Sequence, residues 1–216
     1  METVLPAAPC SKCQGLGYLG AASAFGFPAK CFKCSGTGKI QMHHLHVGDH
    51  ACYLYEDPEK QLAIAASFLA EGLKKNQRCV YVADEHRPEE ILSVLSAAGI
   101  RTKEESDKGN LSIITKHETY LADGTFVPEK MVDRLRQISK SASQQGGRPV
   151  RSAAEMSWAS KEVERHNALV NYELLVDFFF LNVEPKMLGL CQYNVKHFHS
   201  AIIDGMRLSH RLVFQD

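Results

Sequence analysis

The sequence predicts an α/β fold, with a mainly parallel sheet covered by helices on both faces, preceded by a small cysteine-rich module. From residue 50 onward, short apolar segments typical of buried strands alternate with amphipathic segments of helical period, which is the pattern of a parallel sheet. Four of the 7 cysteines, in contrast, lie near the start of the chain. We therefore divide the 216 residues into a module at 1–41, a linker at 42–46 and an α/β domain at 47–216.

The first half of the domain contains three predicted strands. The segment HACYLYE at 50–56 is a buried strand, and RCVYVADE at 78–85 is a second one, rich in β-branched and aromatic residues. Pro88 suits the first turn of the helix that follows, and Gly99 ends it. LSIIT at 111–115 is the third strand. The helix between the first two strands has an apolar face at i, i+3, i+4, i+7 and i+11, formed by Leu62, Ala65, Ala66, Leu69 and Leu73.

The second half continues the alternation. A helix begins at Pro128, and the polar segment 141–149 is a loop. The remaining strands are predicted at 150–156, 187–193 and 211–214, and the remaining helices from about Ser160 to Asp177 and from about Val195. A domain of this length buries enough apolar surface to be stable.

Composition and charge exclude several classes of protein. Apolar residues make up 44% and charged residues 23%, close to the average for globular chains, which excludes a disordered or low-complexity protein. The 25 basic and 25 acidic residues give a net charge of +0, so the bulk charge indicates neither a nucleic-acid nor an anionic-membrane partner. No apolar run approaches the roughly 20 residues that span a bilayer, and no export signal is evident. We expect a cytoplasmic protein.

The cysteine-rich module contains an internal repeat, CSKCQGLG and CFKCSGTG, in which both copies obey C-x-x-C-x-G-x-G. Two thiolates separated by two residues face the same point, and two such pairs complete the four positions around a tetrahedral ion. The glycines allow positive φ and a close approach of backbone N–H groups to the thiolates. The spacing favours a structural Zn²⁺ over four free cysteines in a flexible tail, with the ligands Cys10, Cys13, Cys31 and Cys34.

This doubled motif resembles the cysteine-rich zinc region of DnaJ-type co-chaperones, with two repeats where that family has four. The resemblance implies zinc binding by the four cysteines. The chain contains no J-domain HPD signature, so the resemblance does not imply co-chaperone activity.

The strand ends of a parallel α/β sheet usually carry its function. A nucleotide-binding version would need a glycine-rich turn after the first strand, but the turn EDPEKQ at 56–61 is acidic and lacks glycine. Gly38 and Lys39 do not belong to a phosphate-binding loop either, because Ile40 replaces the required Ser or Thr. We expect no nucleotide hydrolysis.

Four residues at the predicted strand ends are candidates for a ligand pocket. Glu155 and Trp158 follow the fourth strand, and Gln192 and Tyr193 end the fifth. In a pocket at this edge, the aromatic rings would form apolar walls and the polar side chains would orient the ligand. The single tryptophan admits two interpretations, a lid over the pocket or an element of core packing.

His50 and Cys52 lie on the same face of the first strand, because residues two apart project in the same direction. With Cys191 they would form a second metal or redox site. The alternative is a satisfied histidine among small buried thiols, since free cysteine commonly packs as a small hydrophobic residue. Cys79 is expected in the core.

A longer pattern extends over most of residues 46–214. Its marks are the pair H-x-C at His50, the turn EMSW at Glu155, Glu173 in the segment YELL, the segment CQYNVKHF at Cys191, and the late His210. In this order they resemble the MEDS domain, the sensory domain of methanogen and methylotroph regulators. The resemblance implies a RecA- or KaiC-type fold that lacks the phosphate loop.

The resemblance also implies a small, often hydrocarbon-derived ligand and a fused or separate regulatory partner. It alone makes Glu173 a candidate binding residue, because a mid-helix carboxylate usually faces solvent. The chain has no helix-turn-helix, kinase or ATPase output domain in its sequence pattern, so direct DNA binding and phosphotransfer are not implied.

The sequence thus favours a zinc-containing sensory or regulatory protein that binds a small molecule and signals to a partner. Two alternatives stay open: a redox or metal-dependent enzyme that uses His50, Cys52 and Cys191, and a zinc-dependent nucleic-acid-binding transcriptional regulator. No Ser/His/Asp order, paired catalytic carboxylates or H-E-x-x-H motif is present, which argues against an enzyme.

Overall fold

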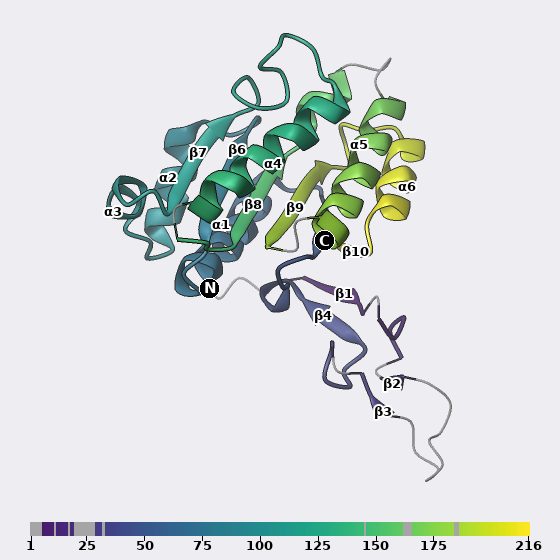
Figure 1. Cartoon of the computed structure of the whole chain (residues 1–216). Coiled ribbons are helices and arrows are strands. Elements are labelled where there is room, and N and C mark those ends of the chain that lie inside the picture. Colours follow the sequence, from purple (N-terminus) through teal and green to yellow (C-terminus); the bar gives the residue numbers. More distant parts are fainter. Residues whose placement is uncertain are drawn as a thin grey trace.

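A six-stranded sheet forms the centre of the α/β domain in the computed structural model (Figure 1). Every pairing in it is parallel, in the order β10-β5-β9-β8-β6-β7, which confirms the predicted fold class. The strands are β5 (His50–Tyr55), β6 (Arg78–Ala83), β7 (Leu111–Thr115), β8 (Val150–Glu155), β9 (Met187–Asn194) and β10 (Leu212–Gln215). The structure describes residues 6–10, 12–16, 18–19, 29–31, 33–144, 146–161, 166–183 and 186–216.

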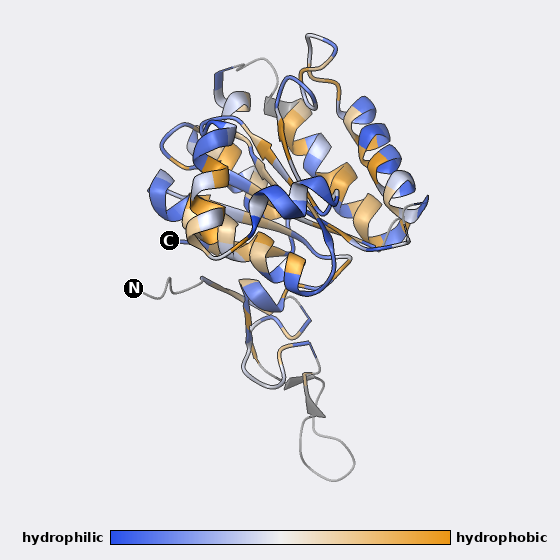
Figure 2. Cartoon of the chain, turned by 90° about the vertical axis from the view of Figure 1, so that its left-hand side faces the viewer, coloured by the Kyte–Doolittle hydropathy of each residue, from blue (hydrophilic) through white to orange (hydrophobic). Residues whose placement is uncertain are grey.

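Helices cover both faces of the sheet and turn their apolar residues toward it (Figure 2). One face packs against α1 (Pro58–Lys74) and α2 (Pro88–Ala97). The other packs against α4 (Pro128–Gln144), α5 (His166–Phe178) and α6 (Ser200–Ser209). A 3₁₀ helix, η2 (Ser157–Lys161), follows β8, and a π-helical turn, η4 (Phe179–Val183), extends α5. None of the helices in the described ranges is long and apolar enough to cross a membrane.

Three local elements differ from those expected. Helix α3 (Thr102–Asp107) has no buried residue, so no apolar period marks it in the sequence. The predicted helix at 160–177 is divided into η2 and α5, and residues 162–165 lie outside the described ranges. Helix α6 begins later than expected, because the residues after Asn194 form a turn. The side chain of Asn194 accepts the backbone N–H of Lys196, and its backbone carbonyl accepts the N–H of His197.

The cysteine-rich module projects from the base of the domain (Figure 1). Strand β1 (Ala7–Pro9) pairs antiparallel with β4 (Lys39–Gln41), and β2 (Tyr18–Leu19) pairs with β3 (Ala29–Lys30). The module contacts the domain through β1 and β10. A 3₁₀ turn, η1 (Met42–His44), leads into the domain. Lys33 also forms an ion pair of 2.7 Å with Asp49, just before β5.

The register of β5 and β9 brings His50 opposite Gly189 and Cys52 opposite Cys191. Because side chains alternate along a strand, His50 and Cys52 project toward α5 and α6, whereas Ala51 and Tyr53 pack against α1. The sheet therefore presents His50, Cys52 and Cys191 to the interior beneath α5.

We expect Gly189→Ala to destabilise the domain. A Cβ atom at residue 189 would lie 2.6 Å from Cε2 of Phe180 in the π-helical turn, too close for carbon atoms. Overpacking of this kind typically costs about 1–3 kcal/mol of unfolding free energy, measurable by chemical denaturation. Combining Gly189→Ala with Phe180→Leu should recover part of this loss. Strictly additive losses in the double variant would contradict the assigned contact.

Candidate functional site

The four N-terminal cysteines converge in the module and are buried there. Sγ of Cys10 lies 3.8 Å from that of Cys31, and Sγ of Cys13 lies 3.7 Å from that of Cys34. All four sulfur atoms lie within 4.8 Å of one another. Tetrahedral coordination with metal–sulfur bonds of about 2.3 Å requires sulfur atoms about 3.8 Å apart. The arrangement can therefore hold a metal ion.

The two copies of the repeat adopt matching turns. The residue after each second cysteine is left-handed, with φ of 51° at Gln14 and 52° at Ser35, and the glycine that follows also has positive φ. Desolvation opposes ionisation of Cys34, but backbone N–H groups of Gly38 and Gly36 outweigh it and lower the pKa of this thiol to about 6. The glycines of the motif thus stabilise a thiolate, which is the form that binds metal. Gly17 lies outside the described residues.

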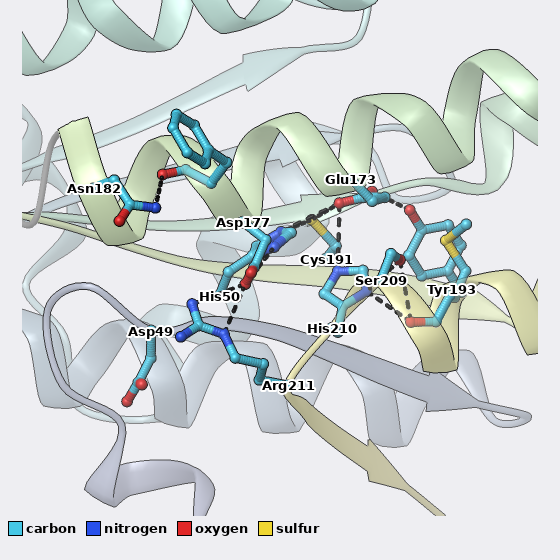
Figure 3. A network of polar contacts seen from close by, with 12 residues as sticks. Asp49, His50, Glu173, Asp177, Asn182, Cys191, Tyr193, Ser209, His210 and Arg211 are labelled. Atoms are coloured by element: carbon cyan, nitrogen blue, oxygen red, sulfur yellow. Dashed lines mark hydrogen bonds and ion pairs between the residues drawn. The ribbon is translucent and has the colours of Figure 1, made fainter. Parts of the chain in front are cut away.

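A second group of potential ligands, here called the buried cluster, lies beneath α5 (Figure 3). Its four donor atoms all lie within 4.8 Å of one another, and its residues are buried: His50, Glu173, Cys191 and His210. They come from four separate segments, namely the start of β5, the middle of α5, the middle of β9 and the residue after α6. Tertiary structure alone assembles this cluster.

Oε2 of Glu173 lies close to all three other donors of the buried cluster. It is 3.2 Å from Nε2 of His50, 3.3 Å from Nε2 of His210 and 3.5 Å from Sγ of Cys191. Nε2 of His50 also lies 3.4 Å from Sγ of Cys191. The other oxygen of Glu173, Oε1, accepts a hydrogen bond from the hydroxyl of Tyr193.

Burial and the neighbouring groups together set the ionisation of the cluster. Burial opposes ionisation of Glu173, but the adjacent imidazoles of His210 and His50 outweigh it and hold the pKa of this carboxyl well below its usual range. Burial, reinforced by His210, lowers the pKa of His50, so its imidazole is neutral at pH 7. Burial and the nearby carboxylate raise the pKa values of Cys52 and Cys191 well above the usual range for a thiol. Such thiols are poor nucleophiles.

An interior cavity adjoins the buried cluster. It lies between the sheet and the helices α4 and α5, and its volume is about 30 Å³. Most of its walls are apolar side chains, including Val80, Leu135 and Tyr172, while His50 and Cys191 form a polar part of its wall. This is more than one water molecule requires, so the cavity has room for a small molecule.

The residues predicted at the strand ends have other surroundings. Oε2 of Glu155 accepts the backbone N–H groups of Asp84 (2.7 Å), Glu85 (2.6 Å) and His86 (3.1 Å). Its Oε1 lies 2.6 Å from the hydroxyl of Tyr81 and 2.7 Å from Nδ1 of His86. The carboxylate therefore fills a nest of backbone donors of the kind that binds anions.

A second carboxylate occupies the position where a phosphate-binding loop would lie. Asp57 caps α1, and its Oδ1 accepts the N–H groups of Glu59 (2.9 Å) and Lys60 (3.3 Å). A helix N-terminus that binds a side-chain carboxylate is not free to bind a phosphate. This gives the acidic turn at 56–61 a structural role.

Gln192 and Trp158 are buried. Like Glu155 and Tyr193, they line neither the interior cavity nor the shallow hollow at the strand ends. Oε1 of Gln192 accepts a hydrogen bond of 2.5 Å from Gln61. The indole of Trp158 stacks on Tyr120, at 4.9 Å between ring centroids. Because Tyr120 lines the interior cavity, Trp158 lies one layer behind its wall.

The structure thus brings together His50, Glu173, Cys191 and Tyr193, and it places Glu155, Trp158 and Gln192 elsewhere. Cys52 lies beside Cys191 but is not one of the four clustered donors. The expectation that a mid-helix Glu173 faces solvent is wrong, because its exposed fraction is 0%. His210 also joins the cluster; the sequence marks it only as part of the MEDS-like pattern and not as a candidate ligand.

The pair of Glu155 and His86 should make stability depend on pH. Despite burial, hydrogen bonds from His86 and Tyr81 lower the pKa of Glu155 below 4.5, so the stability that its carboxylate contributes is complete above pH 4.5 and is lost as the pH falls through the lowered value. The hydrogen bond to Glu155 raises the pKa of His86 above 6.5. The stability that the protonated imidazole contributes is therefore complete below pH 6.5 and is lost as the pH rises through the raised value.

We therefore expect the difference in unfolding free energy between the unchanged protein and Glu155→Gln to be largest between pH 4.5 and 6.5. The expected loss there is about 1–3 kcal/mol, and urea denaturation at several pH values measures it. Glu129→Gln, at an exposed position on α4, is the control. A difference that does not change with pH would contradict the assigned pair.

Comparison with known proteins agrees with this architecture. The chain is similar to a KaiC-like protein of the archaeon Pyrococcus horikoshii OT3, with a TM-score of 0.56, 13% identity, and coverage of 78% of this chain and 70% of the other. It is also 26% identical over 160 residues to the transcriptional repressor DcmR of Methylorubrum extorquens. That match covers 74% of this chain and 57% of the repressor, so the chain spans little more than half of its relative.

The model of a sensory domain family matches residues 49–211, which include all four residues of the buried cluster. The match covers nearly all of the α/β domain and confirms the resemblance drawn from the sequence. Together with the similarity to a repressor, it supports a sensory or regulatory role. The chain belongs to the MEDS family, the methanogen/methylotroph, DcmR sensory domain.

Proposed function

We propose that the protein is a sensor whose α/β domain binds a small molecule in the interior cavity and signals to a regulatory partner. The observation that carries the proposal is the cavity itself, an apolar space inside a member of a sensory domain family. Its size suits a molecule of one or two carbon atoms, and His50 and Cys191 supply polar contacts at one end. A small hydrocarbon derivative fits this combination.

Helix α5 offers a route from the cavity to a partner. Tyr172 and Val176 on its inner side line the cavity, and Glu173 belongs to the buried cluster. Leu174 and Phe178 on the same helix are exposed, with exposed fractions of 52% and 60%. A ligand that displaces the inner side of α5 would move these apolar side chains at the surface, where a regulatory protein could detect the change.

The geometry does not favour the alternative of a thiol-based redox enzyme. Cys52 and Cys191 are buried, and the raised pKa values keep both in the unreactive thiol form. The alternative of a nucleic-acid-binding regulator has no support from the net charge of +0. A partner protein therefore remains the preferred recipient of the signal.

Binding in the cavity should be detectable with small apolar probes. We expect xenon, dichloromethane and ethanethiol to raise the melting temperature and to change the fluorescence of Trp158, which stacks on a wall residue of the cavity. Ala154→Val adds two methyl groups to the wall and should abolish both effects. Val176→Ala enlarges the cavity and should shift the preference toward larger probes.

An exposed substitution, Glu129→Gln, controls for nonspecific effects of the probes. A response that is equal in Ala154→Val and in the unchanged protein would show that the probes bind elsewhere and would contradict the proposed pocket. A folded protein that responds to none of the probes would also contradict it.

We also propose that the four cysteines of the module bind a structural Zn²⁺. Two C-x-x-C pairs with sulfur atoms 3.7–3.8 Å apart suit a closed tetrahedral site. The ion would fix the two turns of the repeat relative to each other. Because β1 contacts β10, it would also hold the module against the α/β domain.

Cys31→Ser should release this zinc and unfold residues 1–41, while the α/β domain retains its fold because it has its own core. Metal analysis of the purified protein and circular dichroism measure the two effects. Ser35→Gly is the matched control, because a position with φ of 52° favours glycine and lies outside the ligand set. An unchanged zinc content in Cys31→Ser would contradict the proposed ligands.

A further inference from the structure

The donor atoms of the buried cluster are spaced like the ligands of a tetrahedral ion. Bonds of about 2.0–2.1 Å to nitrogen and oxygen and about 2.3 Å to sulfur place nitrogen and oxygen about 3.3 Å apart, and sulfur about 3.5 Å from either. The two nitrogen–oxygen separations are 3.2 and 3.3 Å. Two of the three separations that involve Sγ are 3.4 Å, to Nε2 of His50, and 3.5 Å, to Oε2 of Glu173. All four agree with a single ion between the donors.

The hydrogen bonds of His210 indicate that a cation is needed there. Its Nδ1 lies 2.8 Å from the carbonyl oxygen of Met206, which only accepts hydrogen bonds, so Nδ1 carries a proton. In a neutral imidazole, Nε2 then carries a lone pair, which faces Oε2 of Glu173 at a distance of 3.3 Å between the two atoms. Two lone pairs at this distance repel each other. Either a proton, carried by His210 or by Glu173, or a metal ion must lie between them.

The use of all four donor groups favours a metal ion over a proton. A divalent ion with one carboxylate and one thiolate has no net charge, which suits a cluster whose side chains are buried in an apolar interior. A proton on His210 would balance the charge of the Glu173 carboxylate. Cys191 would then remain a neutral thiol beside this carboxylate, which already has several donors around it. A bound metal ion deprotonates a coordinating thiol and uses all four groups.

The surrounding contacts hold the donors in the orientation that a metal requires. The bond from Nδ1 of His210 to the carbonyl of Met206 directs Nε2 toward the cluster. The hydroxyl of Tyr193 binds Oε1 of Glu173, which leaves Oε2 for a single bond to the ion. Oδ1 of Asp177, one turn after Glu173, lies 3.9 Å from Nδ1 of His50. Such outer contacts typically fix the histidines and carboxylates of metal sites.

The geometry points to a second metal site in the protein, in which the buried cluster binds Zn²⁺ inside the α/β domain. Two imidazoles, one thiolate and one carboxylate in a tetrahedron form a donor set that zinc accepts. The inference does not depend on the proposed sensory function, because the cluster would bind the ion with the cavity empty. If both hold, the ion lies at the end of the cavity that His50 and Cys191 line.

The test counts metal ions in the full chain. The protein purified with zinc should contain two zinc ions by native mass spectrometry, one for each cluster. Cys191→Ala and Glu173→Gln should each lose one of the two. The matched control for the thiol is Cys79→Ala, which removes a buried cysteine from the opposite face of the sheet and should keep both ions. Circular dichroism shows which variants are folded.

A second measurement does not require changes in the core. In a full chain with all four module cysteines replaced by serine, Co²⁺ should bind at one site and give the visible bands of a tetrahedral ion, with near-ultraviolet charge transfer from a single thiolate. If this folded chain binds neither zinc nor Co²⁺, the cluster is a proton-linked ion pair and the inference is wrong. One zinc in the unchanged protein that persists in Cys191→Ala would also overturn it.

Discussion

The carboxylate of Glu173 has an exposed fraction of 0%, and the arrangement of the domain around it follows from this constraint. A buried charge is costly unless several polar groups compensate it. Here the compensating groups come from β5, from β9 and from the residue after α6. Strands β5 and β9 and the end of α6 are therefore fixed to α5 through one side chain. This links segments that are distant in the sequence more specifically than apolar packing does.

The sheet and most helices could be predicted from the sequence, because periodicity and turn residues are local signals. The strand at 111–115 has its predicted bounds, and Pro128 begins α4 as expected. Prediction failed where the local signal was weak or ambiguous. Helix α3 buries nothing, and the turn after Asn194 depends on one side-chain hydrogen bond. The parallel order of the six strands agrees with the alternation of strands and helices.

The candidate site could be predicted only in part. His50 and Cys191 were identified because a histidine and thiols on one strand face suggest polar chemistry, and the C-x-x-C repeat identified the module cysteines by spacing alone. Glu173 resembled a surface carboxylate, since a helix sequence does not state which of its polar residues turns inward. The position of His210 depends on an extended backbone after α6, with φ of −118°, which no local pattern specifies. Convergence of four segments is a property of the tertiary fold.

The carboxylate of Glu155 has a consequence for how this scaffold could be changed. Together with Asp57 it supplies an anion at each of two groups of backbone N–H donors, of which the one at the start of α1 lies where a phosphate-binding loop would be. Because these anions belong to the chain, their local concentration does not vary with the nucleotide pool of the cell. Inserting a glycine-rich loop after β5 would not by itself restore nucleotide binding, since the substrate would compete with two tethered carboxylates. The order of these loops thus comes from carboxylates of the chain itself.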